Sequence, residues 1–214
     1  MSTSRLPEAL GHYVASRAKP DDDFLVQLKR ESKLAGLPAI WIGPHQAAAM
    51  ALLLQVSGAS EVVEVGTLGG YSAICMARAL PPTGRVRTIE LDAKHADFAE
   101  HWIAESDVAA RIEVLRGAGA DILPAIEDNS TDAVFLDADK QGYSAYTAHA
   151  ARILRPGGLL LVDNAFAFGN LLDTTCTDPS VEAIRAINNE LAAHPAFDGV
   201  MLPVGDGMWA LRRN

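Results

Sequence analysis

Short apolar runs alternate with segments of helical spacing from residue 61 almost to the end of the chain, and glycine, proline or acidic residues separate them. Runs of this length and composition are typical of strands, and the segments between them are typical of helices. The alternation predicts an α/β fold, in which helices cover both faces of a mostly parallel sheet. The predicted strands cover residues 61–65, 86–91, 111–115, 132–137 and 158–163, and the helices between and after them cover 71–80, 93–106, 119–126, 143–154 and 181–193.

The two ends of the chain depart from this alternation. Two further strands are predicted near residues 199–203 and 208–212, and the linker Val204-Gly205-Asp206-Gly207 is too short for a crossover helix, so these strands should be antiparallel. The beginning of the chain reads as helices at residues 6–17, 21–35 and 44–56. We expect one domain over residues 1–214, with residues 1–57 as a helical N-terminal extension.

Composition excludes several classes of protein. The formal net charge of −9 argues against a nucleic-acid partner, because phosphate binding needs a basic face. No apolar run reaches the roughly 18 residues that a membrane-spanning helix needs, and the first ten residues lack the pattern of a signal peptide. We expect a cytoplasmic protein whose two cysteines, Cys75 and Cys176, are free thiols.

A glycine-containing loop, residues 66–70, follows the first predicted strand, where sheets of this kind bind ligands. Gly66 lets a ligand approach the backbone, and the next helix offers free N–H groups. Glu90 ends the second strand, where a carboxylate can accept hydrogen bonds from ribose hydroxyls. This spacing fits NAD as well as S-adenosylmethionine (SAM). Leu68 replaces the second glycine of the dinucleotide pattern, and Glu64 would suit the ammonium of a methionine moiety better than a pyrophosphate.

Oxygen-bearing side chains follow two further strands. Asp137 ends the fourth strand, and Asp163 and Asn164 follow the fifth. If these strands are neighbours, two carboxylates and an amide oxygen meet at one edge of the sheet, which suits a hard cation such as Mg²⁺. Lys140 lies close by in sequence. The alternative is that both aspartates cap turns or helices and that Lys140 forms a surface ion pair with Asp139.

Four runs together resemble a known family. VVEVGTLGGYSAICMARALPPTGRVRTIELD, AVFLDADKQGY, GGLLLVDN and MLPVGDGMWALRR are similar to the cation-dependent, SAM-dependent O-methyltransferases, which include catechol and caffeoyl-coenzyme A O-methyltransferases. The resemblance extends from about residue 42 to the C-terminus. It implies a Rossmann-like sheet of seven strands, mostly parallel, with the last strand antiparallel. It also implies a homodimer, and an N-terminal extension that contributes to the cofactor and substrate site.

The resemblance also implies site residues and a reaction. Lys140 and Asp137 fall on catalytic positions, and Asp137, Asp163 and Asn164 on those of ligands to a divalent cation, for which we expect Mg²⁺. The cofactor positions are occupied by Ile42, Glu64, Gly66, Thr67, Ser72, Glu90, Ala118 and Asp139. The implied enzyme moves a methyl group from SAM to one hydroxyl of a catechol-like aromatic diol that binds the cation, while Lys140 takes or holds the hydroxyl proton.

The chain departs from the family at the acceptor site. Where the plant enzymes carry a tryptophan and an asparagine, this chain carries Ala167 and Phe168, which predicts a more apolar wall. A small aromatic diol then fits better than a coenzyme A thioester. Two alternatives stay open: an NAD-dependent Rossmann-type enzyme, and a non-catalytic protein that binds the cofactor.

Overall fold

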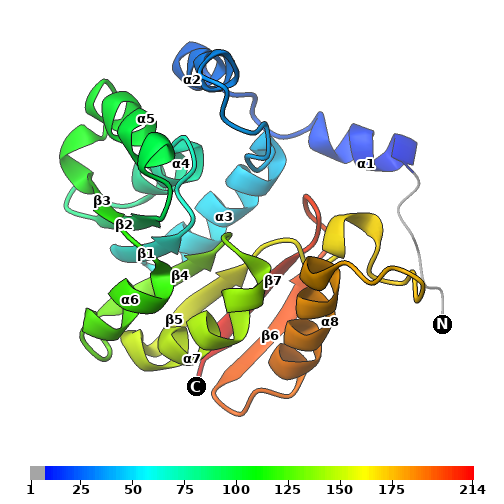
Figure 1. Ribbon diagram of the computed structural model, residues 1–214. Helices are drawn as coiled ribbons and strands as arrows, with labels where there is room; N and C mark the ends of the chain where they lie inside the picture. The colour runs from blue at the N-terminus through cyan, green and yellow to red at the C-terminus, as the bar shows by residue number, and fades with distance from the viewer. Residues whose placement is uncertain (1–7) are drawn as a thin grey trace.

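The computed structural model describes residues 8–214, and within them a seven-stranded sheet forms the centre of the molecule (Figure 1). The strand order is β3-β2-β1-β4-β5-β7-β6, and β7 is antiparallel to both of its neighbours while the remaining pairs are parallel. This confirms the predicted sheet, including its antiparallel last strand. The strands are β1 Glu61–Val65, β2 Arg85–Glu90, β3 Ile112–Arg116, β4 Thr131–Leu136, β5 Leu154–Val162, β6 Phe197–Leu202 and β7 Met208–Arg213.

The helices agree with the predicted segments to within a few residues at their ends. The first was predicted to begin at Leu6, which lies outside the described residues. The α-helices are α1 Glu8–Ala15, α2 Asp23–Leu34, α3 Pro44–Ser57, α4 Tyr71–Ala79, α5 Ala93–Ala104, α6 Gly119–Ile122, α7 Tyr143–Ile153 and α8 Pro179–Ala192. Residues 8–214 also contain four short 3₁₀ turns: η1 Ala109–Arg111, η2 Leu123–Ala125, η3 Lys140–Gly142 and η4 Ala167–Gly169. Among residues 8–214, no helix is both long and apolar enough to cross a membrane.

One strand begins earlier than predicted. Strand β5 starts at Leu154, which pairs with Thr131 of β4, whereas the sequence predicted that it starts at residue 158, after Pro156 and Gly157. The register shifts between Thr131 and Ala133, so the proline occupies an irregular stretch of the strand. A proline, which has no N–H to donate, is tolerated at such a bulge.

The sheet separates two hydrophobic cores. Alternate residues of a strand face opposite sides, and so Val62 packs into the core with α2 to α5, while Val63 packs into the core with α7 and α8. Figure 1 shows α3, α4 and α5 on one side of the sheet and α6, α7 and α8 on the other. Covering both faces explains why the paired runs Ala133–Leu136 of β4 and Leu159–Val162 of β5 are apolar at every position rather than alternating.

The strand order reverses between β1 and β4, which lie side by side although they are first and fourth in the chain. Backbone hydrogen bonds continue one residue beyond the strand ends: Asp137 N–H donates to Val65 O at 2.9 Å, and Asp163 N–H donates to Leu136 O at 3.0 Å. Gly66 N–H likewise donates to Ile89 O at 2.9 Å. The first residues after β1, β4 and β5 are therefore held next to one another along the C-terminal edge of the sheet.

Candidate active site

A cavity of about 830 Å³ opens at this edge of the sheet. Ten of the predicted site residues line it: seven lie in the loops after α2, β1, β3, β4 and β5, and the other three, Ser72, Glu90 and Lys140, lie in α4, β2 and η3. Glu64 and Asp163 are buried and are not among the lining residues. The predicted residues that line the cavity are Ile42, Gly66, Thr67, Ser72, Glu90, Ala118, Asp137, Asp139, Lys140 and Asn164.

The loop after β1 depends on a glycine. Gly66 has a φ of +103°, and a Cβ added there would lie 2.0 Å from the carbonyl oxygen of Asp137. No side chain fits at that distance, so the closeness of the two strand ends requires glycine at this position. The same closeness brings the predicted cofactor loop against the predicted cation ligands.

The carboxylate of Glu90 organises this loop. Its Oε2 accepts hydrogen bonds from the N–H groups of Thr67 at 3.1 Å and Leu68 at 2.8 Å, and its Oε1 accepts one from Asp92 N–H at 2.9 Å. The sequence predicted that Glu90 binds a ribose but gave no sign of these bonds. Leu68 has a φ of +49°, a backbone conformation that is uncommon for residues other than glycine. The hydrogen bond from its N–H to Glu90 helps to stabilise this conformation.

Glu64 lies beneath the cavity with both oxygens occupied. Ser72 Oγ donates to Oε1 and Thr88 Oγ1 donates to Oε2, each at 2.5 Å. Burial raises the pKa of Glu64 to about 8, and the charges of Asp137 and Glu90 act in the same direction. The raised pKa favours the protonated form of Glu64 in the ligand-free protein, in which one of these two hydroxyls accepts the carboxyl proton instead of donating, and a cation placed beside Ser72 would favour release of that proton.

Asp163 is 5% exposed, and its Oδ1 accepts a hydrogen bond of 2.6 Å from the side-chain amide of Gln46. Burial raises the pKa of Asp163 above its usual value, and the charge of Asp137 raises it further. Gln46 was not predicted as a site residue, because its partner lies far away in sequence. The available signal was a glutamine placed on the apolar face near the start of a helix.

Lys140 is buried beside Asp137. Its Nζ lies 3.1 Å from Asp137 Oδ1 and 2.7 Å from the hydroxyl oxygen of Tyr143. Asp139 instead accepts a hydrogen bond of 2.7 Å from the hydroxyl of Tyr146, so the alternative of a surface pair between Lys140 and Asp139 is wrong. Helical spacing made Tyr143 look like an ordinary core residue, and its contact with Lys140 was missed.

Phe168 lines the cavity and is 54% exposed, whereas Ala167 is buried against Val181 and Ile184. Of the two residues expected to shape the acceptor wall, only Phe168 faces the cavity. Both residues have left-handed backbone conformations, with φ values of +53° for Ala167 and +56° for Phe168. Such conformations are rarely adopted by residues with side chains, so the surrounding contacts must hold this turn in place.

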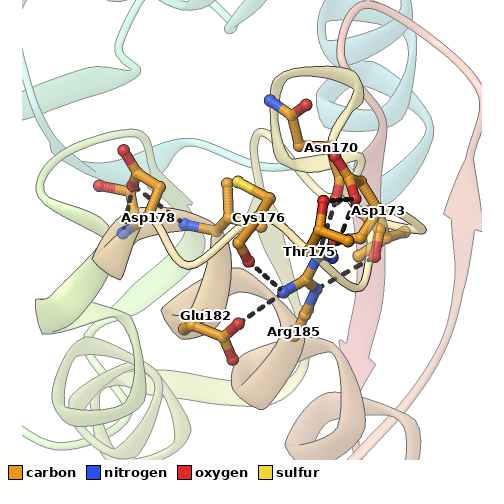
Figure 2. A network of polar contacts seen from close by, with 10 residues as sticks. Asn170, Asp173, Thr175, Cys176, Asp178, Glu182 and Arg185 are labelled. Atoms are coloured by element: carbon orange, nitrogen blue, oxygen red, sulfur yellow. Dashed lines mark hydrogen bonds and ion pairs between the residues drawn. The ribbon is translucent and has the colours of Figure 1, made fainter.

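A side chain of helix α8 holds the loop that follows Phe168 through hydrogen bonds. Figure 2 shows the guanidinium of Arg185 within this loop, at the centre of a network of polar contacts. Because arginine carries five N–H donors in a planar fork, one side chain can satisfy several loop carbonyls at once. Arg185 donates to Glu182 Oε1 and to the carbonyl oxygens of Asn170, Leu171, Asp173 and Cys176.

The donor set at this edge suits a hard cation. Within residues 8–214, no three His, Cys, Asp or Glu side chains gather as a metal site. The set here consists of the carboxylates of Asp137 and Asp163 together with the amide of Asn164. The charge of Asp137 lies close enough to raise the pKa of the buried Asp163, and Lys140 alone balances the negative charge of these two carboxylates only in part. A divalent cation with oxygen ligands would balance the rest.

The chain matches known proteins over almost its whole length. A family model described as "O-methyltransferase" matches residues 15–214. A protein of Niastella koreensis named catechol O-methyltransferase is 38% identical over 91% of this chain and 90% of its own. One of the same name from Mycobacterium tuberculosis is 35% identical over 95% and 92%. An O-methyltransferase from Bacillus cereus, solved in complex with SAH, superposes with a TM-score of 0.87 at 36% identity and covers 96% of this chain and 97% of its own.

Proposed function

Because the chain belongs to the SAM-dependent O-methyltransferase family, we propose that it methylates one hydroxyl of a small vicinal aromatic diol held by a divalent cation. The observation that carries the proposal is the arrangement of Asp137 and Asp163 beside the glycine loop, with Lys140 against Asp137. Two relatives named catechol O-methyltransferase support the class of acceptor. The family match also favours methyl transfer over the NAD-dependent alternative.

SAM would bind along the loops after β1 and β2. Its ribose hydroxyls would meet Glu90, whose carboxylate already holds the glycine loop in place. Its ammonium would approach Ser72 and favour the ionised form of Glu64 behind it. The apolar side chain of Ile42 would cover part of the bound molecule.

Asp137, Asp163 and Asn164 would hold the divalent cation, for which Mg²⁺ is the natural choice with oxygen ligands. A cation held there supplies a Lewis acid that favours ionisation of the acceptor hydroxyl. Gln46 keeps one oxygen of Asp163 oriented. Because both side chains are buried, water does not compete for the hydrogen bond between them.

Lys140 would take or hold the proton of the reacting hydroxyl at Nζ. Its contacts with Asp137 and with the hydroxyl of Tyr143 keep that nitrogen at the edge of the cavity. The acceptor oxygen then forms its bond to the methyl carbon as the carbon–sulfur bond breaks, and SAH leaves. Holding the two reactants in line in one cavity is worth roughly 7–11 kcal/mol of the barrier.

A comparison of isomeric acceptors tests this proposal. Catechol, resorcinol and hydroquinone are dihydroxybenzenes that differ only in the spacing of their hydroxyls, and only catechol presents two neighbouring oxygens to one cation. With SAM and Mg²⁺, we expect monomethyl product from catechol and little from the other two, as read by mass spectrometry. Equal rates with all three would reject a vicinal diol. Tight SAM binding without methylation of any acceptor would favour the non-catalytic alternative.

The resemblance also predicts a homodimer. Light scattering coupled to size-exclusion chromatography would test this, with a mass of twice 22.7 kDa as the expected result.

A further inference from the structure

The turn between β6 and β7 lies against the loop that follows β5. Backbone hydrogen bonds join the two segments: Ala165 N–H donates to Gly207 O at 2.9 Å, and Phe166 N–H donates to Asp206 O at 2.8 Å. We propose that Asp206, in this turn, is a positioning residue that orients the amide of Asn164 toward the cavity and fixes Phe168 in the cavity wall. This inference rests on the proposed function, because Asn164 is one of the proposed cation ligands.

The first contact sets the orientation of an amide. Oδ2 of Asp206 lies 3.4 Å from Nδ2 of Asn164. An ionised carboxylate only accepts hydrogen bonds, so the NH₂ end of the amide must face Asp206. The oxygen at the other end of the planar amide is thereby directed away from Asp206, and Asn164 lines the cavity while Asp206 does not. A hard cation needs the oxygen and gains nothing from the NH₂ group.

The second contact fixes the wall of the cavity. The same oxygen of Asp206 accepts a hydrogen bond of 2.7 Å from the backbone N–H of Phe168. Phe168 has a left-handed backbone conformation, φ +56° and ψ +33°, which a phenylalanine adopts only when its surroundings impose it. Its side chain is more than half exposed, so packing restrains it weakly. The bond to Asp206 therefore contributes much of what holds the ring in its place.

The turn itself is held tightly enough to act as a support. Asp206 lies between Gly205 and Gly207, whose φ values are +58° and +78°. A Cβ on Gly207 would lie 2.6 Å from the ring of Phe166, and Gly205 N–H donates to His45 Nε2 at 3.1 Å. The backbone on both sides of Asp206 is thus fixed against α3 and against the loop after β5. One carboxylate then orients a proposed cation ligand and a wall residue together.

Asp206→Ala removes both contacts, and Asp206→Asn keeps an acceptor oxygen that can serve both donors. Asp132→Ala is the matched control, because Asp132 also accepts backbone N–H bonds from a neighbouring loop, those of Ser60 and Glu61, at the opposite edge of the sheet. Two quantities are measured in each variant with SAM present. One is the dissociation constant of Mn²⁺ by electron paramagnetic resonance, and the other is the ratio of the two monomethyl products of 3,4-dihydroxybenzoate.

We expect Asp206→Ala to weaken Mn²⁺ binding by about 10–100-fold, as loss of a partner that orients a metal ligand does, and to shift the product ratio. Asp206→Asn should stay near the wild type in both quantities, and Asp132→Ala should change neither. If Asp206→Ala does not fold, Asp206→Ser replaces it with the same expectation, because its hydroxyl is too short to reach both donors.

Wild-type Mn²⁺ affinity in Asp206→Ala would overturn the orientation of Asn164, and an unchanged product ratio would overturn the role at Phe168. If Asp132→Ala changed the Mn²⁺ affinity and the product ratio as much as Asp206→Ala does, both effects would come from general destabilisation, and the proposal would be overturned. If the wild-type protein itself binds no Mn²⁺, the proposed cation dependence fails, and the role of Asp206 toward Asn164 fails with it.

Discussion

The side-chain amide of Gln46 donates a hydrogen bond of 2.6 Å to Oδ1 of Asp163, although 117 positions separate the two residues in sequence. Both side chains are buried, at 2% and 5% exposure. Helix α3 therefore reaches the end of strand β5 and contacts a proposed cation ligand directly. A helix of the N-terminal part of the chain thus contacts the C-terminal edge of the sheet, where the candidate site lies.

Replacing Gln46 with leucine should destabilise the protein by about 1–3 kcal/mol, because Asp163 would lose a donor while staying buried. Gln55→Leu is the control, since Gln55 lies exposed on the same helix and should change stability by no more than about 0.5 kcal/mol. Urea unfolding at pH 8 measures both. Equal losses in the two variants would show that the bond to Asp163 contributes nothing.

Gly205→Ala should destabilise the protein more than Gly58→Ala. Both glycines have left-handed φ values, +58° and +65°, so both substitutions carry similar backbone strain. A Cβ on Gly205 would lie 1.9 Å from Oε1 of Gln46, whereas one on Gly58 meets nothing within 4 Å. The difference between the two variants in unfolding free energy measures the cost of displacing Gln46.

That cost should come from the loss of the bond between Gln46 and Asp163. In a protein that already carries Gln46→Leu, Gly205→Ala should therefore lower the unfolding free energy only by the backbone strain that Gly58→Ala measures. A double-mutant cycle on the two positions measures this coupling. Full additivity would contradict the contact between the turn and Gln46.

Glu64→Gln should stabilise the ligand-free protein increasingly as the pH rises. Burial raises the pKa of Glu64 in the folded protein to about 8 from 4.5. Between these values the unfolded chain releases a proton that the folded protein keeps, so the wild type loses stability as the pH rises, by about 1.4 kcal/mol per pH unit at most. Glutamine does not titrate, so the advantage of the variant should appear near pH 5, grow to about pH 8 and then level off.

Urea unfolding of both proteins at several pH values measures this advantage. Glu61→Gln on the same strand serves as the control, because Glu61 is less buried than Glu64. A difference between Glu64→Gln and the wild type that stays constant from pH 5 to pH 8 would contradict a proton on Glu64. The same variant should bind SAM more weakly, since glutamine offers no charge to the ammonium.

Arg185→Met should raise the KM for the acceptor on the order of tenfold, since small displacements of a positioning segment are costly, with little change in SAM affinity. Arg185 holds the carbonyl oxygens of the loop that follows Phe168 (Figure 2). Without those bonds the cavity wall would lose its fixed position, while the loops that meet SAM would keep theirs. Steady-state kinetics with varied catechol, together with calorimetric titration of SAM, separate the two effects.

Arg152→Met is a matched control for this substitution. Arg152 also donates to several loop carbonyls, those of Leu123, Pro124 and Ile126, but these lie at least four positions from any residue that lines the cavity, whereas Asn170, a partner of Arg185, lies two positions from Phe168. Its loss should lower stability and leave the acceptor KM unchanged. A KM that rises equally in both variants would show that Arg185 acts only through general stability.

The sheet could be predicted because its signals are local. Each apolar run of four to six residues was bounded by glycine, proline or acidic residues, and the four-residue linker before residue 208 was enough to predict the antiparallel last strand. The start of β5 was missed, because Pro156 and Gly157 normally end elements. In this fold the pairing of Leu154 with Thr131 continues the strand through them, and such long-range pairing has no local signature.

The positions of the candidate site residues could be predicted to the same extent. Asp137 and Asp163 directly follow strands, and Lys140 comes three residues after Asp137, so their residue types are informative without knowledge of their partners. The contacts that orient them were missed, because Gln46 and Asp206 lie far from their partners in sequence. Tyr143 was missed for another reason: its position among apolar residues at helical spacing is that of a core residue, and only the contact with Lys140 distinguishes it.

We expect methyl transfer to need a divalent cation at Asp137, Asp163 and Asn164. The most direct test is the rate of catechol methylation in chelator-treated enzyme, followed by titration with Mg²⁺, in the wild type and in Asp163→Asn. We predict that chelation abolishes turnover, that Mg²⁺ restores it with saturation in the wild type, and that Asp163→Asn needs far more Mg²⁺ for any recovery. Undiminished turnover of the chelator-treated wild type would show that no cation is required.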